Sequence, residues 1–177
     1  TPKPSSAASD VYKRQQTSPP EAKGATILMN TNFFTTGTQH NKPTHSLDQK
    51  LRELLIGQKV TKADDGTLTL DNGVILELYE SDQDCCAHAY GTWKITNPNN
   101  LEAGITDITY EYNAEEHSDE SQTNTLTISL LHNQNPIAQA HCWADDGNGG
   151  YYFSVLSMRV AIKGQENNPD IFQVLEA

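Results

Sequence analysis

The chain has 177 residues, about the length of one domain, and 36% of them are hydrophobic. Its 12 Lys and Arg stand against 23 Asp and Glu, and the resulting formal net charge of −11 disfavours direct binding to the phosphates of nucleic acids. No apolar run approaches the roughly 18 residues of a membrane span, and three cysteines are too few for a disulfide scaffold, so we expect a cytoplasmic protein with reduced thiols.

Residues 1–15, which include SSAASDVYKRQ, resemble a translated transposase adapter from a sequencing library. The resemblance implies an artefact in the translation of an assembled metagenome sequence, and the segment is excluded from fold reasoning. Residues 16–28 are predicted to be untranslated leader, because codons for Lys23-Gly24-Ala25 can contain a ribosome-binding sequence; a disordered linker is the alternative. Translation would then start at Met29. Four of the basic and two of the acidic residues precede it, so the remainder carries −13.

Residues 29–45 are rich in Thr and Asn and lack an apolar period, which predicts a flexible arm. They also lack the basic start and apolar run of a secretion signal. A short helix is predicted next, with Ser46 as N-cap and Gln49 at the reciprocal capping-box position. Leucines then recur at helical spacing, and Gly57 ends the pattern: Leu47, Leu51, Leu54 and Leu55. We expect this helix to pack over an open end of the domain.

Beyond the helix the hydrophobic period changes to two, which predicts strands. In VILELYE, Val74, Leu76 and Leu78 share one face, and the residues between them are predicted to be semi-exposed. Asp65-Gly66 and Asn72-Gly73 predict hairpins with type I′ turns, which need positive φ at both central residues. The strand candidates are Lys59 to Asp64, Thr67 to Asp71, Val74 to Ser81, Ala87 to Thr96, Ile105 to Asn113, Thr123 to His132, Pro136 to Ala144 and Tyr151 to Ile162.

Glu115 to Gln122, EEHSDESQ, is predicted to be a charged solvated loop, and Asp145 to Gly150, DDGNGG, a hairpin turn. Seven or eight short strands predict a mainly β domain over residues 46–165, an antiparallel sandwich or partly open barrel with one short helix. A parallel sheet is disfavoured because no crossover helix separates the strands. Residues 166–177 form a C-terminal tail and a candidate edge strand.

Three stretches, IGQKVTKADDGTLTLDNGVILELYESDQDCCAHAYGTW, ITDI and GNGGYYFSVLSMRV, resemble an uncharacterised family of domains of unknown function found in bacteriophages and their actinobacterial hosts. The resemblance covers about Leu51 to Val160, and the adjacent cysteines Cys85 and Cys86 are its most specific element. It implies a phage or prophage context and a β fold. Because that family has no established activity, the resemblance implies no mechanism.

Five side chains, in DQDCCAHAYGTW and AHCW, are candidate zinc ligands: Cys85, Cys86, His88, His141 and Cys142. Zinc needs about four such ligands in a tetrahedron. Neighbouring side chains of a strand point to opposite faces, so neither Cys85 and Cys86 nor His141 and Cys142 would reach one metal, unless a turn frees the cysteine pair. We therefore favour no metal site, and expect one thiol of each stretch to fill the core.

Catalysis is not expected either. Cys86, His141 and Asp84 include a nucleophile, a base and an orienting acid, but no signature segment supports them as a set, and no cofactor is predicted. A redox role is not favoured, because adjacent cysteines close a strained ring. Aromatic residues could form a stacking platform, although aromatics in strands more often fill the core: Trp93, Trp143, Tyr151, Tyr152 and Phe153.

These observations predict a small, non-enzymatic phage or prophage accessory protein that binds another protein through its acidic surface or an exposed sheet edge. One alternative is a zinc-stabilised β module with Cys and His ligands. Another is an acidic mimic of nucleic acid that blocks a DNA-binding protein, which requires acidic side chains gathered on one face. The sequence predicts neither the partner nor the oligomeric state.

Overall fold

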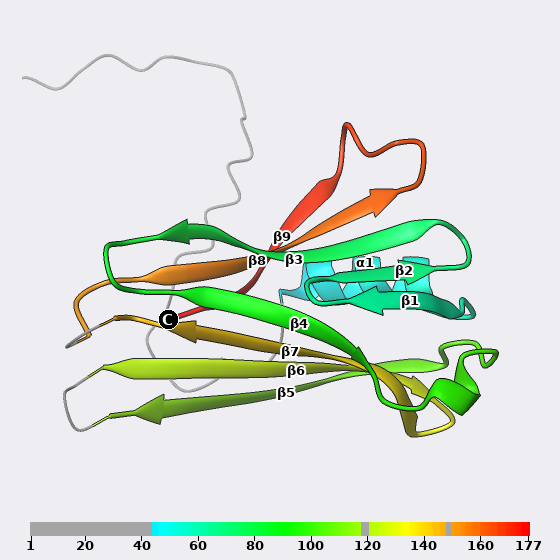
Figure 1. The fold of residues 1–177 in the computed structure, drawn as a ribbon, viewed down its shortest axis with the longest axis horizontal. Coiled ribbons are helices and arrows are strands. Elements are labelled where there is room, and N and C mark those ends of the chain that lie inside the picture. Colours follow the sequence, from blue (N-terminus) through cyan, green and yellow to red (C-terminus); the bar gives the residue numbers. More distant parts are fainter. Residues whose placement is uncertain (1–43, 118–120, 148–149) are drawn as a thin grey trace, which may run out of the picture. The chain divides into compact units, whose positions relative to one another are not determined.

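The structure is a computed structural model that describes residues 44–117, 121–147 and 150–177, all within one compact unit, Gln39–Ala177. The predicted adapter segment, the predicted leader and all but the last two residues of the predicted arm lie outside the described residues. The helix α1 precedes nine strands, which form two antiparallel sheets (Figure 1). No helix of the described part is long and apolar enough to cross a membrane.

The two sheets face each other as a sandwich and do not close into a barrel (Figure 1). The first has the order β1 (Val60–Asp64), β2 (Thr67–Leu70), β3 (Val74–Gln83), β8 (Ser154–Ile162) and β9 (Asp170–Glu176). The second has the order β4 (Ala89–Ile95), β7 (Asn135–Asp145), β6 (Gln122–His132) and β5 (Asp107–Glu116), with the short 3-10 helix η1 (Pro98–Asn100) after β4. The predicted mainly β, antiparallel fold is confirmed. The strands number nine because the C-terminal segment adds β9 beside β8.

The core lies between the sheets and follows the alternation of side chains along each strand. Val74, Leu76 and Leu78 of β3 are buried and the residues between them are half-buried, as predicted. On β4, Gly91 permits a close approach of the first sheet, since a Cβ there would lie 2.8 Å from Leu78 Cδ1 and 3.2 Å from Leu156 Cδ2. The sheets therefore pack directly against each other at this point.

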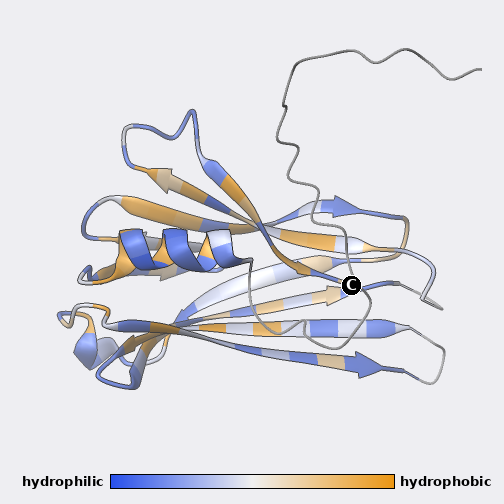
Figure 2. Ribbon diagram, turned by 180° about the vertical axis from the view of Figure 1, so that it is seen from behind, coloured by the Kyte–Doolittle hydropathy of each residue, from blue (hydrophilic) through white to orange (hydrophobic). Residues whose placement is uncertain are grey.

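Helix α1 (His45–Leu55) covers one side of the sandwich (Figure 2). Three of its leucines are completely buried: Leu47, Leu51 and Leu55. The N-cap is Thr44 and not Ser46, because the Thr44 carbonyl accepts the amide of Leu47 at 2.9 Å. The predicted capping box is therefore wrong, and Ser46 lies in the first turn, where its hydroxyl donates to Thr44 Oγ1.

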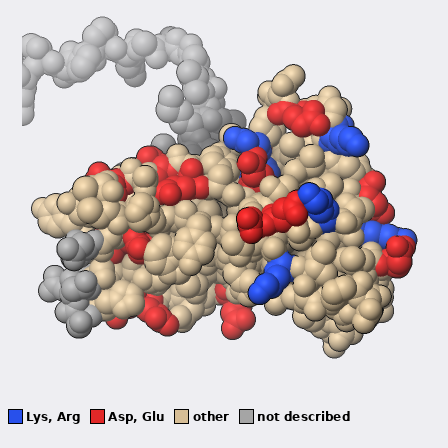
Figure 3. Space-filling view, viewed as in Figure 1, with Lys and Arg blue, Asp and Glu red and all other residues tan. Residues whose placement is uncertain are grey.

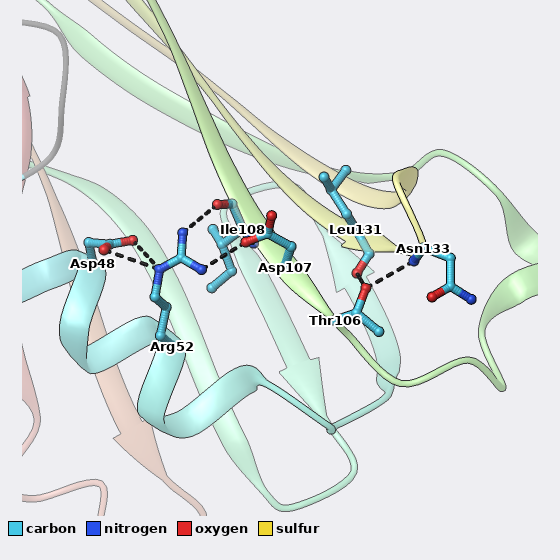
Figure 4. A network of polar contacts seen from close by, with 7 residues as sticks. All are labelled: Asp48, Arg52, Thr106, Asp107, Ile108, Leu131 and Asn133. Atoms are coloured by element: carbon cyan, nitrogen blue, oxygen red, sulfur yellow. Dashed lines mark hydrogen bonds and ion pairs between the residues drawn. The ribbon is translucent and has the colours of Figure 1, made fainter.

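One guanidinium links α1 to the second sheet (Figure 4). Arg52 donates to Asp48 within the helix, to Asp107 Oδ1 at 2.8 Å, and to the carbonyl of Ile108 at 2.8 Å. On the other sheet, Lys50 forms an ion pair with Asp170 of β9 at 2.8 Å. Helix α1 therefore connects one edge strand of each sheet, β9 of the first and β5 of the second.

The predicted hairpins are present, but their turns are not type I′. Gly73 has a φ of +82°, whereas Asn72, Asp65 and Gly66 do not have positive φ. Gly66 is needed for space, because a Cβ there would lie 2.8 Å from the carbonyl oxygen of Leu78. Positive φ at two successive turn residues occurs instead at Asn133-Gln134, with values of 47° and 71°, between β6 and β7.

Two predicted loop boundaries are also corrected. Glu115 and Glu116 continue β5 and pair with residues of β6, which begins at Gln122, so the predicted loop EEHSDESQ loses two residues to strand at its start and one at its end. Its residues 118–120 lie outside the described residues. The last strand before the tail begins at Ser154 and not at Tyr151. The strand ends are set by hydrogen bonding between the paired strands, so they differ by a few residues from the ends that side-chain periodicity indicates.

We predict that Gly91→Ala destabilises the protein by about 1–3 kcal/mol, because the added methyl overpacks the contact with Leu78 and Leu156. The measurement is the free energy of unfolding in urea. Thr92→Ala, at the next and exposed position of β4, is the matched control and should cost less than about 1 kcal/mol. Equal losses for the two variants would contradict close packing at Gly91.

We also predict a pH-dependent contribution from the Arg52–Asp107 contact. The hydrogen bond from Arg52 lowers the pKa of Asp107, so the stabilisation is complete above the unfolded-state value of about 3.9 and is lost as the pH falls through the lower folded-state pKa. The pair is solvent-exposed, so Asp107→Asn should cost only about 0.2–1 kcal/mol at pH 7. The difference in unfolding free energy between the wild type and Asp107→Asn should shrink towards pH 2. A difference that does not change with pH would contradict the contact. Glu53→Gln, which removes an exposed carboxylate of α1, is the control.

Candidate functional site

The adjacent cysteines lie in the turn between β3 and β4. The amide of Ala87 donates to the carbonyl of Asp84 at 2.9 Å, and Cys85 and Cys86 are the two residues between them. Strand β4 begins only at Ala89, so the prediction that a strand starts at Ala87 is corrected. Released from strand alternation, the two Sγ atoms lie 3.3 Å apart and both residues are exposed. The prediction that one of these two thiols fills the core is therefore wrong, and only Cys142 is buried as expected. We call Cys85 and Cys86 the thiol pair.

The connection between β7 and β8 holds this turn in place. Asp145 Oδ1 accepts the amides of His88 at 3.0 Å and Gly147 at 3.1 Å. The hydroxyl of Ser154 lies 2.8 Å from the carbonyl of His88 and 2.6 Å from that of Asp145. Gly147, with a φ of +73°, packs so closely that a Cβ there would lie 3.2 Å from the amide nitrogen of Ala87. The Asp145 carboxylate therefore has a structural role.

The structure does not bring the five candidate zinc ligands together. His88 is exposed, with Nδ1 3.8 Å from Glu80 Oε1. His141 lies on the outer face of β7 beside Thr92, whereas Cys142 points into the core and is 3% exposed, as strand alternation predicts for this pair. Burial raises the pKa of Cys142 to about 12. Within the described residues, no group of three or more His, Cys, Asp and Glu side chains could hold a metal ion.

The nucleophilic set considered from the sequence is not assembled either. His141 pairs with Thr92 of β4. Thr92 is three residues beyond Ala89, the first residue of this strand, which corresponds to about 10 Å along the strand axis. Cys86 precedes Ala89 by three residues in the opposite direction. Cys86 and His141 are therefore separated along the length of the strands. Asp84 is near Cys86 in the chain but is not brought near His141 by this pairing.

Aromatic side chains gather on the outer surface near the thiol pair. Tyr90 of β4 stacks on Trp143 of β7 with ring centroids 5.1 Å apart, and Tyr151 is 86% exposed. Trp93 is 4% exposed and belongs to the core, which removes it from the predicted platform. Sequence reasoning missed Tyr90, although the alternation that buries Ala89 and Trp93 places Tyr90 outside.

Carboxylates gather at the same end of the sandwich, where β3, β5, β7 and β9 end and β4, β6 and β8 begin. We call this the acidic end, and its members are Glu80, Asp82, Asp84, Glu115, Glu116, Asp145, Asp146 and Glu176. Among described residues the Lys and Arg lie in the rest of the domain; on the face shown in Figure 3, the left end is red without blue. Charge is therefore strongly segregated along the sandwich.

The acidic side chains have two different roles. Asp146 Oδ1 accepts the amide of Gln122 at 2.7 Å, so Asp146, like Asp145, stabilises a turn. By contrast, four side chains at the C-terminal ends of β3 and β5 are exposed and form no ion pair with Lys or Arg in the described part of the chain: Asp82, Asp84, Glu115 and Glu116. Glu176 of β9 is exposed as well and accepts a hydrogen bond from the side-chain amide of Gln173. The carboxylates at the ends of β3 and β5 are accessible to a ligand, and two of them also accept a local hydrogen bond: Asp82 Oδ1 from the amide of Gln83, and Glu115 Oε1 from the side chain of Asn113.

The described chain is thus a two-sheet antiparallel β-sandwich with an acidic end that carries exposed thiols and aromatics. It belongs to the family described as Domain of unknown function (DUF7448), which matches residues 53–158. The match runs from α1 into β8 and includes the turn that holds the thiol pair. A search of curated proteins and a search of solved structures each found no match.

We predict that an alkylating reagent such as iodoacetamide modifies the thiol pair in the native protein well before Cys142. Burial keeps Cys142 protonated and shielded, and the thiolate is the reactive form. Intact-mass spectrometry in buffer and in denaturant measures the difference, and Cys142→Ser should leave the native reaction unchanged. Modification of Cys142 at the rate of the thiol pair would contradict the buried position.

Proposed function

We propose that the chain is a small acidic accessory protein of a bacteriophage or prophage that acts in the bacterial cytoplasm by binding a basic surface of another protein, without catalysing a reaction. The observation that carries this proposal is the acidic end, where exposed carboxylates gather away from the Lys and Arg of the described residues. The phage context rests on the resemblance of the paired-cysteine segment to phage and actinobacterial domains.

Segregated charge favours a charged partner. Exposed carboxylates at one end create a negative potential that speeds encounter with a basic surface, and this effect weakens as salt is added. Tyr90, Trp143 and Tyr151 lie at the same end and supply aromatic surface of the type that dominates binding energy at protein interfaces. The acidic end therefore combines negative charge, which attracts a basic partner, with aromatic side chains that can be buried in an interface.

The edge of the second sheet leads into this surface. Strand β5 is outermost, and no strand of the described residues pairs with its outer side. Its last four residues, Asn113 to Glu116, are exposed and end at the acidic end. Charged residues on such an edge discourage pairing between identical chains, while a basic strand could add to it by main-chain hydrogen bonds. Edge and charge thus favour the same kind of partner.

A second candidate function is mimicry of nucleic acid, which the gathering of carboxylates at one end also favours. The partner would then be a DNA-binding protein whose basic site is its DNA-binding surface. The two functions differ in one measurable respect: duplex DNA competes with a mimic for its partner, whereas it does not compete for a basic surface elsewhere on the partner.

We predict that neutralising the four exposed carboxylates at the ends of β3 and β5 weakens partner binding about tenfold or more. Each exposed charge contributes a few tenths of a kcal/mol to the binding free energy. The full chain serves as bait in a host-cell extract, a captured protein is purified, and its affinity is measured over a range of salt. The variant combines Asp82→Asn, Asp84→Asn, Glu115→Gln and Glu116→Gln. The matched control neutralises four exposed carboxylates elsewhere that likewise form no ion pair in the described part of the chain: Glu53→Gln, Asp65→Asn, Asp71→Asn and Glu166→Gln.

Retention of affinity by the control and loss by the variant support the acidic end as the binding surface. Equal affinities for the two variants, or an affinity that does not depend on salt, would contradict the proposal. Addition of duplex DNA to the same assay separates the general binding function from mimicry.

A further inference from the structure

The thiol pair is held rigidly in a turn whose two sides are both anchored. On one side the amide of Asp84 donates to the carbonyl of Phe153 at 2.9 Å, and on the other the amide of His88 donates to Asp145 Oδ1 at 3.0 Å. A Cβ on Gly147 would lie 3.3 Å from the carbonyl carbon of Cys86, so the neighbouring connection packs against the turn itself. The positions of both thiols are therefore set by surrounding structure.

The backbone at this turn is unusual. Cys85 has a φ of +26°, a value that few residues other than glycine adopt and that costs of order 1–3 kcal/mol. In an extended strand the two side chains would point to opposite faces, whereas here the sulfurs are in contact at 3.3 Å. Strain of this kind at an exposed position is typical of functional sites.

The spacing of the sulfurs distinguishes two chemistries. A disulfide needs them about 2.0 Å apart, and also needs Cα atoms at least ~4.4 Å apart, whereas neighbouring residues have a Cα spacing of about 3.8 Å. Two bonds of about 2.3 Å at a tetrahedral metal place the sulfurs roughly 3.8 Å apart. From 3.3 Å, chelation requires a widening of about 0.5 Å in a ring that is one atom larger, while disulfide formation requires a contraction of about 1.3 Å against strain.

The electrostatic surroundings agree with a cation. Asp84 adjoins the thiol pair, Asp82 is nearby in sequence, and within the described residues no Lys or Arg lies at this end. Two thiolates at this site would repel each other, because the sulfurs lie only 3.3 Å apart. A soft divalent cation between the sulfurs removes that repulsion and is attracted by the neighbouring carboxylates.

We propose that Cys85 and Cys86 form a chelating site for a soft, thiophilic divalent metal ion. Each thiol loses its proton to solvent and each sulfur forms one bond to the metal, so two protons are released and no oxidation state changes. Thiolate ligands select soft metals over Ca²⁺ and Mg²⁺. Among the described His, Cys, Asp and Glu side chains none joins the thiol pair as a third ligand, and the side chain of Tyr152 lies within hydrogen-bonding reach of Cys85. The thiol pair thus supplies two ligands, and water or small molecules would complete the coordination. This open site differs from the closed four-ligand zinc site considered from the sequence.

The test uses the full chain, reduced with a phosphine, and Cd²⁺ as the probe. Absorption from sulfur-to-cadmium charge transfer, together with calorimetry, should show one ion bound per chain with release of protons. Cys85→Ser and Cys86→Ser should each weaken binding at least about tenfold and reduce the absorption band, because one thiolate remains, and the double variant should abolish it. Both positions are exposed, and thermal unfolding checks that the variants remain folded.

Three controls separate the thiol pair from its surroundings. Cys142→Ser should bind Cd²⁺ like the wild type, and excess Ca²⁺ should not displace the bound Cd²⁺. The four-carboxylate variant should retain the absorption band at saturating Cd²⁺, with a weaker affinity because Asp82 and Asp84 no longer attract the cation. Retention of the band separates this site from the protein-binding function. Displacement by Ca²⁺, or wild-type affinity in folded Cys85→Ser and Cys86→Ser, would overturn the proposal. Rapid loss of two hydrogens from the thiol pair on exposure to oxidised glutathione would overturn the geometric preference for chelation.

Discussion

The apolar faces of the two sheets can be buried together in one register alone, because a shift of one residue would turn every inward side chain towards solvent. Strand β3 pairs with β8 from Val74–Ile162 to Gln83–Ser154, and β6 pairs with β7 over a similar length. These long central ladders fix where each strand ends. The turns at the acidic end therefore meet as a consequence of core packing, although their own residues contribute little to that core.

In the turns at the acidic end, side chains form hydrogen bonds with backbone groups that lie outside the strand ladders. Asp145, Asp146 and Ser154 satisfy backbone groups that no ladder reaches, which removes the cost of leaving those groups unpaired. This support permits a strained φ at Cys85. Carboxylates at the acidic end thus have two roles: some hold the turns, and others remain exposed.

Segregation of charge along the sandwich has a physical cost and a functional consequence. Like charges at one end repel, and the described cations are instead used in contacts such as those of Arg52 and Lys50, which attach α1 to β5 and β9. The core itself does not require this distribution, because the hydrogen bonds of the exposed carboxylates Asp82 and Glu115 go to neighbouring exposed residues. Protein binding at the acidic end and metal binding at the thiol pair would each make use of an unneutralised negative surface.

The sequence by itself determined the strands, their buried faces and the helix, because alternation and helical spacing are local properties that Val74, Leu76, Leu78 and the leucines of α1 express directly. It also indicated that His141 and Cys142 face opposite ways. Only the tertiary structure decided that Cys85 and Cys86 leave the strand and bring their sulfurs together, since this depends on hydrogen bonds and packing from residues about 60 positions away. The gathering of distant carboxylates at one end likewise follows from which turns become neighbours, and no local pattern records that.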